Sequence, residues 1–183
     1  MAQPVAAVQF QLGQDRKSGW GVKFPDFRRE SYYLAEAKAA AAMTPKEAVP
    51  LWNAAMGGWR GWANEYKVAI DGLKAKADDP EEKVNEVKRK REALKPIWFD
   101  LTTELYRCTI EAQASVNKSD AAKLAAALAK QGGYVFDFEK NNNPLPNGIK
   151  LKLHLMIETY PQLKEGYTNA GGKDLLTAPT IDP

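Results

Sequence analysis

Side chains that could act as acids, bases or metal ligands are few in this chain of 183 residues. Cys108 is the only cysteine and His154 the only histidine, which excludes an internal disulfide, a cysteine-based metal site and a multi-histidine site. His154 has no evident partner that would orient it as a general base. Asp100, Glu104 and Glu111 lie near one another on an expected helix, but they do not make the convergent carboxylate set of two-metal or glycosidase chemistry. We therefore expect no catalytic residues, no metal site and no cofactor.

Two short motifs approach known binding patterns without completing them. The stretch GYTNAGGKD, from Gly166 to Asp174, resembles a phosphate-binding loop, but its first glycine is one position too far from Lys173. The stretch GYVFD, from Gly133 to Asp137, resembles the aromatic strand of an RNA-recognition motif, but an aspartate stands where the last aromatic residue belongs. Neither motif predicts its usual function here.

Basic residues form two groups that could contact phosphates. The densest run is Lys88-Arg89-Lys90-Arg91, and the second group is Lys150, Lys152 and His154. A solvated helix surface is the other interpretation of the first run, because consecutive helical residues point about 100° apart and acidic residues lie nearby. The second group shares one face of an expected strand, close to aromatic residues that could stack on bases. Those aromatic residues are Trp20, Phe24, Tyr134, Phe136 and Phe138.

The composition indicates an ordinary globular protein. The apolar fraction is 44%, the charged fraction is 27% and the formal net charge is +3, which permits an anionic partner without requiring one. The N-terminus lacks the basic and apolar regions of a signal peptide, and no apolar run reaches the roughly 18 residues of a membrane span. We expect a single domain over residues 1–183, a cytoplasmic location and no contact with a membrane.

A long helical hairpin is the main predicted element, and it carries several of the candidate acidic and basic side chains. Apolar residues recur at alternating steps of three and four in two successive stretches, the pattern of a helix with one buried seam. The first seam is Trp52, Met56, Trp59, Ala63, Tyr66, Ile70, Leu73 and Ala77; the second is Val84, Val87, Arg91, Leu94, Trp98, Leu101, Leu105, Cys108 and Ala112. A short polar turn joins them. The sequence therefore predicts antiparallel helices over about 45–77 and 80–116, within a hairpin spanning 44–116, with Trp59 and Trp98 buried.

Small residues mark a second face on the first of these helices. Ala54, Gly57 and Gly61 lie opposite the aromatic seam, with Gly58 at the margin. Each glycine costs about 1 kcal/mol relative to alanine inside a helix, so close approach of another backbone is the expected compensation. The approaching segment could be the alanine-rich stretch 31–43 or a second copy of the chain.

The two ends of the chain alternate with the period of strands. Residues 8–12 and 20–24 predict a hairpin, Tyr134 to Phe138 a third strand, and Ile149 to Ile157 a fourth. A short helix closed by Gly132-Gly133 lies between the N-terminal strand hairpin and the third strand, and residues 166–183 form a tail. The expected fold class is α+β, with a long antiparallel helical hairpin, flanking short helices and a small antiparallel sheet.

Two functions from different classes remain open. The first is a non-enzymatic structural protein that forms a homo-oligomer through Ala54, Gly57, Gly58 and Gly61. The alternative is a protein that binds single-stranded nucleic acid through a basic and aromatic sheet face. An enzyme is disfavoured, because every chemical constellation lacks a part.

Overall fold

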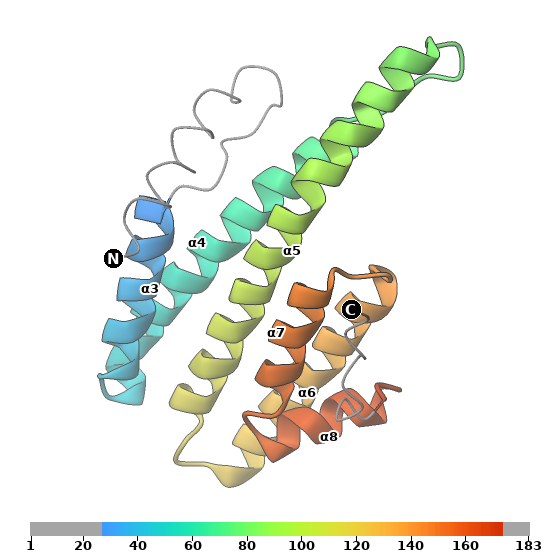
Figure 1. Cartoon of the computed structure of the whole chain (residues 1–183). Coiled ribbons are helices and arrows are strands. Elements are labelled where there is room, and N and C mark those ends of the chain that lie inside the picture. The colour runs from blue at the N-terminus through green and yellow to red at the C-terminus, as the bar shows by residue number, and fades with distance from the viewer. Residues whose placement is uncertain (1–26, 174–183) are drawn as a thin grey trace.

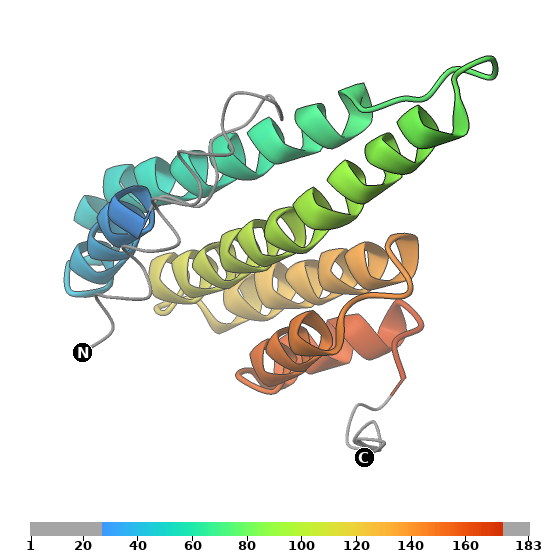
Figure 2. The same cartoon turned by 45° about the horizontal axis from the view of Figure 1, so that its top comes forward.

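The computed structural model describes residues 27–173, and every regular element within that range is a helix. In chain order the helices are α3 (Phe27–Ala41), α4 (Pro45–Gly72), α5 (Glu81–Val116), α6 (Ala121–Asn141), α7 (Asn147–Ile157) and α8 (Pro161–Asn169). Helix α5 runs through the middle, with α4 along one side and α6, α7 and α8 along the other (Figure 2). Helix α3 packs on α4 beside the first half of that helix (Figure 1).

Helices α4 and α5 are the two arms of the expected hairpin and run antiparallel (Figure 1). Pro45 occupies the first turn of α4, and the amide of Ala48 donates to the carbonyl of Thr44 at 2.9 Å. The side chain of Thr44 donates to Glu47 at 2.5 Å instead of capping the backbone. Pro50 and Pro96 lie inside their helices without ending them, and for Pro96 the second seam, which continues unbroken across it, predicts this.

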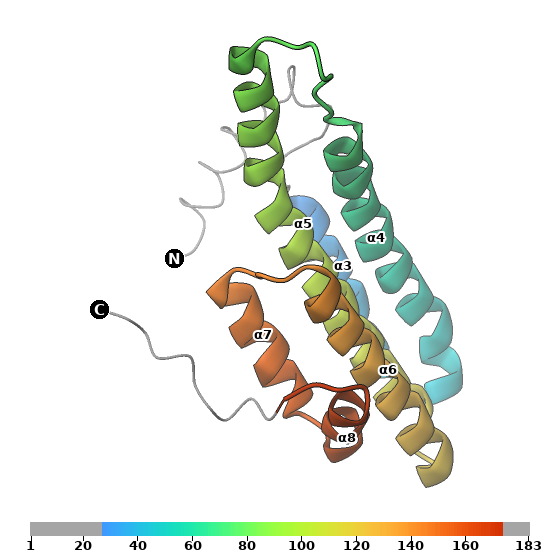
Figure 3. The ribbon, with the colours of Figure 1, turned by 90° about the vertical axis from the view of Figure 1, so that its right-hand side faces the viewer.

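The turn of the hairpin is longer than predicted, because α4 ends at Gly72 and not near residue 77. Arg91, the one charged residue in the second seam, caps the C-terminal end of α4. Its Nη1 donates to the carbonyl of Leu73 at 3.0 Å, which satisfies an acceptor that the helix leaves open. In the turn itself, Asp79 accepts from the amide of Lys76 at 2.8 Å and from Lys83 Nζ at 2.7 Å. The tip projects beyond α6 and α7 (Figure 3).

The aromatic seam of α4 builds the first core cluster, between α3, α4 and α5. Trp52, Trp59 and Trp62 are almost fully buried, and the rings of Trp59 and Trp62 stack with centroids 5.8 Å apart. Tyr33 of α3 meets both of those rings edge-on. The predicted burial of Trp59 is therefore confirmed, whereas Trp98 is half-buried, between this cluster and the second one.

The second core cluster joins α5 to the three C-terminal helices. Its buried members include Phe99 and Ile110 of α5, Leu128 and Val135 of α6, Leu153 of α7 and Leu163 of α8. Helices α6 and α8 touch backbone to backbone. A Cβ atom on Gly132 would lie 2.1 Å from the carbonyl oxygen of Leu163, and one on Gly166 would lie 2.0 Å from that of Ala129. Only glycine fits at either position.

The α+β prediction is wrong, since residues 27–173 contain no strand. Residues 149–157 lie in α7, because Ile149, Leu153, Met156 and Ile157 also fit a helical period, and these four are the buried ones. The alternate positions Leu151 and Leu155 are left 59% and 64% exposed.

The other two predicted strand regions have different outcomes. Tyr134, Phe136 and Phe138 lie on α6, which continues through Gly132-Gly133 because α8 packs on Gly132. The buried set of α6 is Leu128, Gly132, Val135 and Phe138, at helical spacing. The predicted strands at 8–12 and 20–24 lie outside the described residues. The predicted tail begins inside α8, with Gly166 and Tyr167 buried.

Candidate functional site

The four small residues predicted for self-association do not act as one group. Gly58 is used inside the chain, because a Cβ atom there would lie 2.1 Å from Cε1 of the Tyr33 ring. The stretch 31–43 is thus the neighbour of this glycine. Gly57 and Gly61 meet nothing within 4 Å, and Ala54 is exposed beside them.

The open residues of α4 form a continuous surface, which we call the α4 free face: Ala54, Gly57, Gly61, Asn64 and Val68. Their steps of three and four place them along one side of the helix. All five are exposed, and the Val68 side chain is 61% exposed. None carries a charge, and the face is bordered by the ion pair between Glu65 and Arg29 Nη2, 2.8 Å apart.

The first predicted basic group lies near the projecting tip of the hairpin. Lys88 and Arg89 are exposed, but Lys90 is half-buried and pairs with Glu86 at 2.7 Å. This part of α5 is ten residues, or about 15 Å along the axis, from Asp100, which holds the other group's Lys152. The two basic groups therefore do not make one surface.

The second predicted basic group divides over two sides of α7, with Lys150 and His154 one turn apart on one side and Lys152 on another. Lys152 pairs with Asp100 of α5, while Lys150 and His154 are half-buried. Burial, with help from Lys150, lowers the pKa of His154, so its ring is less readily charged than an exposed imidazole. Residues two positions apart share a strand face but point about 200° apart on a helix. The cationic row predicted for a sheet face is therefore wrong.

The aromatic residues predicted to stack on bases are also distributed differently. Phe138 is buried against Trp98, Phe99 and Tyr106, and Phe136 packs on Tyr167. Tyr134 is 43% exposed, with Lys130 Nζ 5.7 Å from its ring centroid. Trp20 and Phe24 lie outside the described residues. In residues 27–173 the nucleic-acid alternative thus has neither its sheet nor its aromatic surface.

A cleft of about 360 Å³ lies between α5 and α7, ending at the turn before α8. Its lining residues are Thr103, Glu104, Arg107, Ile110, Glu111, Lys152, Leu155, Met156, Thr159 and Tyr160. Ile110 and Met156 are buried members of the second core cluster, so the floor is apolar and fixed. Leu155 stands exposed at the side.

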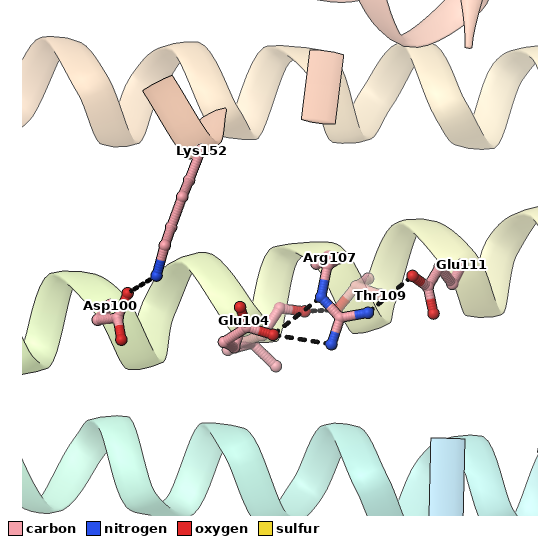
Figure 4. A network of polar contacts seen from close by, with 7 residues as sticks. Asp100, Glu104, Arg107, Thr109, Glu111 and Lys152 are labelled. Atoms are coloured by element: carbon pink, nitrogen blue, oxygen red, sulfur yellow. Dashed lines mark hydrogen bonds and ion pairs between the residues drawn. The ribbon is translucent and has the colours of Figure 1, made fainter. Parts of the chain in front are cut away.

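A polar network follows the α5 side of this cleft (Figure 4). Arg107 is the centre of it: Nε and Nη2 reach Glu104 and Nη1 reaches Glu111, each at 2.8 Å. One turn before Glu104 on α5, Asp100 accepts a hydrogen bond from Lys152, which extends from α7 across to α5 (Figure 4). Burial, together with the carboxylates of Glu104 and Asp100, raises the pKa of Glu30 on α3, against the effect of Lys152. The four charged side chains that line the cleft, Glu104, Glu111, Arg107 and Lys152, balance to a formal charge of zero.

The residues considered for catalysis are placed apart from this cleft or held in ion pairs. Cys108 is buried, and burial raises the pKa of its thiol to about 11, so it remains protonated near neutral pH. Asp100, Glu104 and Glu111 are each paired with a cation. In the described range no group of three or more histidine, cysteine or acidic residues is arranged to hold a metal ion.

Sequence reasoning missed the cleft but two signals of it were present. Glu104, Arg107 and Glu111 are spaced by three and four residues, which predicts a local ion network on one helix face. Leu151 and Leu155 fall outside the helical phase of the buried residues in α7, which marks them as exposed once the element is known to be a helix. The partner of Lys152, 52 residues away, could not be identified.

None of the helices in the described part of the chain is long and apolar enough to cross a membrane. Comparison with known proteins gives no match to a protein-family model, to a curated protein sequence or to a solved structure.

Proposed function

We propose that this protein is a non-enzymatic structural protein that assembles into a homo-oligomer through the α4 free face. The observation that carries the proposal is the contrast between its helical glycines. Gly58, Gly132 and Gly166 each lie where a neighbouring helix leaves no room for a Cβ atom. Gly57 and Gly61 are equally interior to their helix, and none of the described residues lies within 4 Å of a Cβ atom placed on either.

This open space has an energetic cost that no contact among residues 27–173 offsets. A glycine inside a helix is about 1 kcal/mol less favourable than alanine. The cost at Gly58, Gly132 and Gly166 accompanies close helix packing, whereas Gly57 and Gly61 have no such packing within the described residues. A second copy approaching the α4 free face would supply close helix packing at Gly57 and Gly61, because helices that meet at small residues can pack more closely than the usual 8–10 Å between axes.

The surrounding surface favours a helix as the partner. The α4 free face carries no charge, and Val68 at its end offers apolar area at 61% exposure. A homo-oligomer with twofold symmetry would place the same strip on both sides of the contact, which suits a surface of small residues. Gly133 on α6 is also open toward the described residues, but it is half-buried, whereas Gly57 and Gly61 are exposed.

The proposal is tested by sedimentation velocity of the full chain over a range of micromolar concentrations. We expect a defined species of at least twice the 20.3 kDa chain mass, dissociating on dilution if the contact is confined to this strip. A single species at the monomer mass across the whole range would refute self-association. The cytoplasmic location expected from the sequence stays a prediction.

A further inference from the structure

The cleft between α5 and α7 combines the size of a small-molecule site with an apolar floor. Its volume of about 360 Å³ falls within the roughly 300–1,000 Å³ of such sites. Ile110 and Met156 form the floor, and the second core cluster holds both in place. Leu155 lines the side and is 64% exposed, although it is a large apolar side chain. The main gain on binding would therefore come from apolar surface removed from water.

The charged side chains at the cleft are matched with one another. Glu104 and Glu111 both pair with Arg107, at 2.8 Å each. Lys152, the fourth charged lining residue, is paired with Asp100 of α5. A charged ligand would have to compete with one of these existing pairs for its counter-charge, and it would also lose part of its own hydration. An uncharged ligand avoids both costs.

The polar side chains keep hydrogen-bond donors and acceptors available at the same time. Lys152 directs only one N–H at Asp100, and the hydroxyl of Tyr160 donates to no described residue. Glu104 Oε1 and Glu111 Oε2 accept no hydrogen bond from the described part of the chain. A hydroxyl group matches this arrangement, because it is uncharged and both donates and accepts. Its bonds to a carboxylate or an ammonium group would be charge-assisted.

We propose that the cleft between α5 and α7 binds a small uncharged amphiphile, an apolar molecule that carries a hydroxyl group. The apolar part lies on Ile110, Met156 and Leu155. The hydroxyl donates to a carboxylate oxygen on α5, such as that of Glu104, and accepts from Lys152 on the α7 side (Figure 4). The site is separate from the α4 free face, so it does not depend on self-association.

Three probes of equal chain length test this preference: 1-hexanol, which is uncharged, hexylamine, which is cationic, and hexanoate, which is anionic. Each is titrated into the full-length protein while backbone amide NMR shifts are followed. We expect 1-hexanol to shift the amides of Ile110, Leu155 and Thr159, and to bind at least about threefold more tightly than either ion, because only the ions lose charge hydration. No shift at the cleft with 1-hexanol, or an ion that binds equally or more tightly, would overturn the proposal.

Two opposite charge changes test whether the balance of charges sets the preference. Arg107→Gln leaves two carboxylates and one cation in the lining, and should strengthen hexylamine binding about threefold or more. Glu111→Gln leaves one carboxylate and two cations, and should strengthen hexanoate binding to a similar extent. Glu82→Gln removes the same charge in the first turn of α5 and should leave all three affinities unchanged. Unchanged affinities in both cleft variants, or an equal change in Glu82→Gln, would refute the assignment.

The two exposed leucines of α7 provide a matched pair of variants that spare the core. Leu155→Gln removes part of the apolar side of the cleft and should weaken all three probes by a similar factor. Leu151→Gln changes a residue that is 59% exposed, one turn earlier on the same helix and outside the lining, and should bind the probes like the wild type. Undiminished binding to Leu155→Gln, or equal weakening in both variants, would contradict the proposal.

Discussion

Gly58 and Tyr33 are in contact at the crossing of α4 and α3, and the tyrosine ring occupies the place where a side chain would stand. The ring is held there by Trp59 and Trp62 on one side and by Arg29, whose Nε donates to its hydroxyl at 2.9 Å. The neighbouring Gly57 has no such contact. Two adjacent glycines in one helix therefore have different partners, one within the chain and one, we propose, in a second copy.

Gly58→Ala should destabilise the fold by about 1–3 kcal/mol, because the Tyr33 ring must leave its packed position. Gly133→Ala is the matched control, since a Cβ atom there meets nothing within 4 Å. It should be neutral or stabilise by up to about 1 kcal/mol through helix propensity. Urea unfolding of both variants at one protein concentration gives the comparison. Equal stability of the two would contradict the close contact at Gly58.

Gly166→Ala should be more damaging than Gly58→Ala, at about 3 kcal/mol or more, because the obstacle is the backbone of Ala129 rather than a side chain that can move. Gly132→Ala meets the backbone of Leu163 and should behave alike. Thermal unfolding followed by circular dichroism measures the loss. A wild-type melting temperature for either variant would mean that α6 and α8 do not approach this closely.

His154 should make the protein less stable as the pH falls. Burial lowers its folded-state pKa below the usual 6.5, so the unfolded chain binds the proton more readily. The unfolding free energy therefore decreases as the pH drops through about 6.5 and stops changing, for this group, below the folded-state pKa. Because His154 is the only histidine, the wild type and His154→Gln can be compared between about pH 7.5 and 5.5. Parallel stability profiles would contradict the shift.

Cys108 should react with a thiol reagent only after the protein unfolds. It is buried on the seam of α5, and burial raises its pKa to about 11, so both access and thiolate formation are suppressed. Colour release from Ellman's reagent should be negligible in buffer and stoichiometric in guanidinium chloride. Fast reaction of the native protein would show that the α4–α5 seam opens readily.

The hairpin could be predicted from the sequence because its signal is long and redundant. The alternating steps of three and four from Trp52 to Ile70 fit only a helix. The strand predicted for Ile149 to Ile157 is wrong, because an apolar Met156 lets the same residues satisfy both the strand and the helix period. The pair Gly132-Gly133 predicts a helix end, but Gly132 lies inside α6 because the backbone of α8, a distant segment, packs against it. The cleft likewise depends on a contact between distant segments, α5 and α7, which a strand over 149–157 does not predict.

The α4 free face is tested most directly by two substitutions at helical glycines whose Cβ positions are both open toward the described residues. Gly61→Gln and Gly133→Gln each place the same side chain in open space on a helix, and each should keep or raise the helical signal. Light scattering at one micromolar concentration should give the oligomer mass for the wild type and Gly133→Gln, and a lower mass for Gly61→Gln. The same mass for all three proteins, whether monomer or oligomer, would contradict assembly through this face.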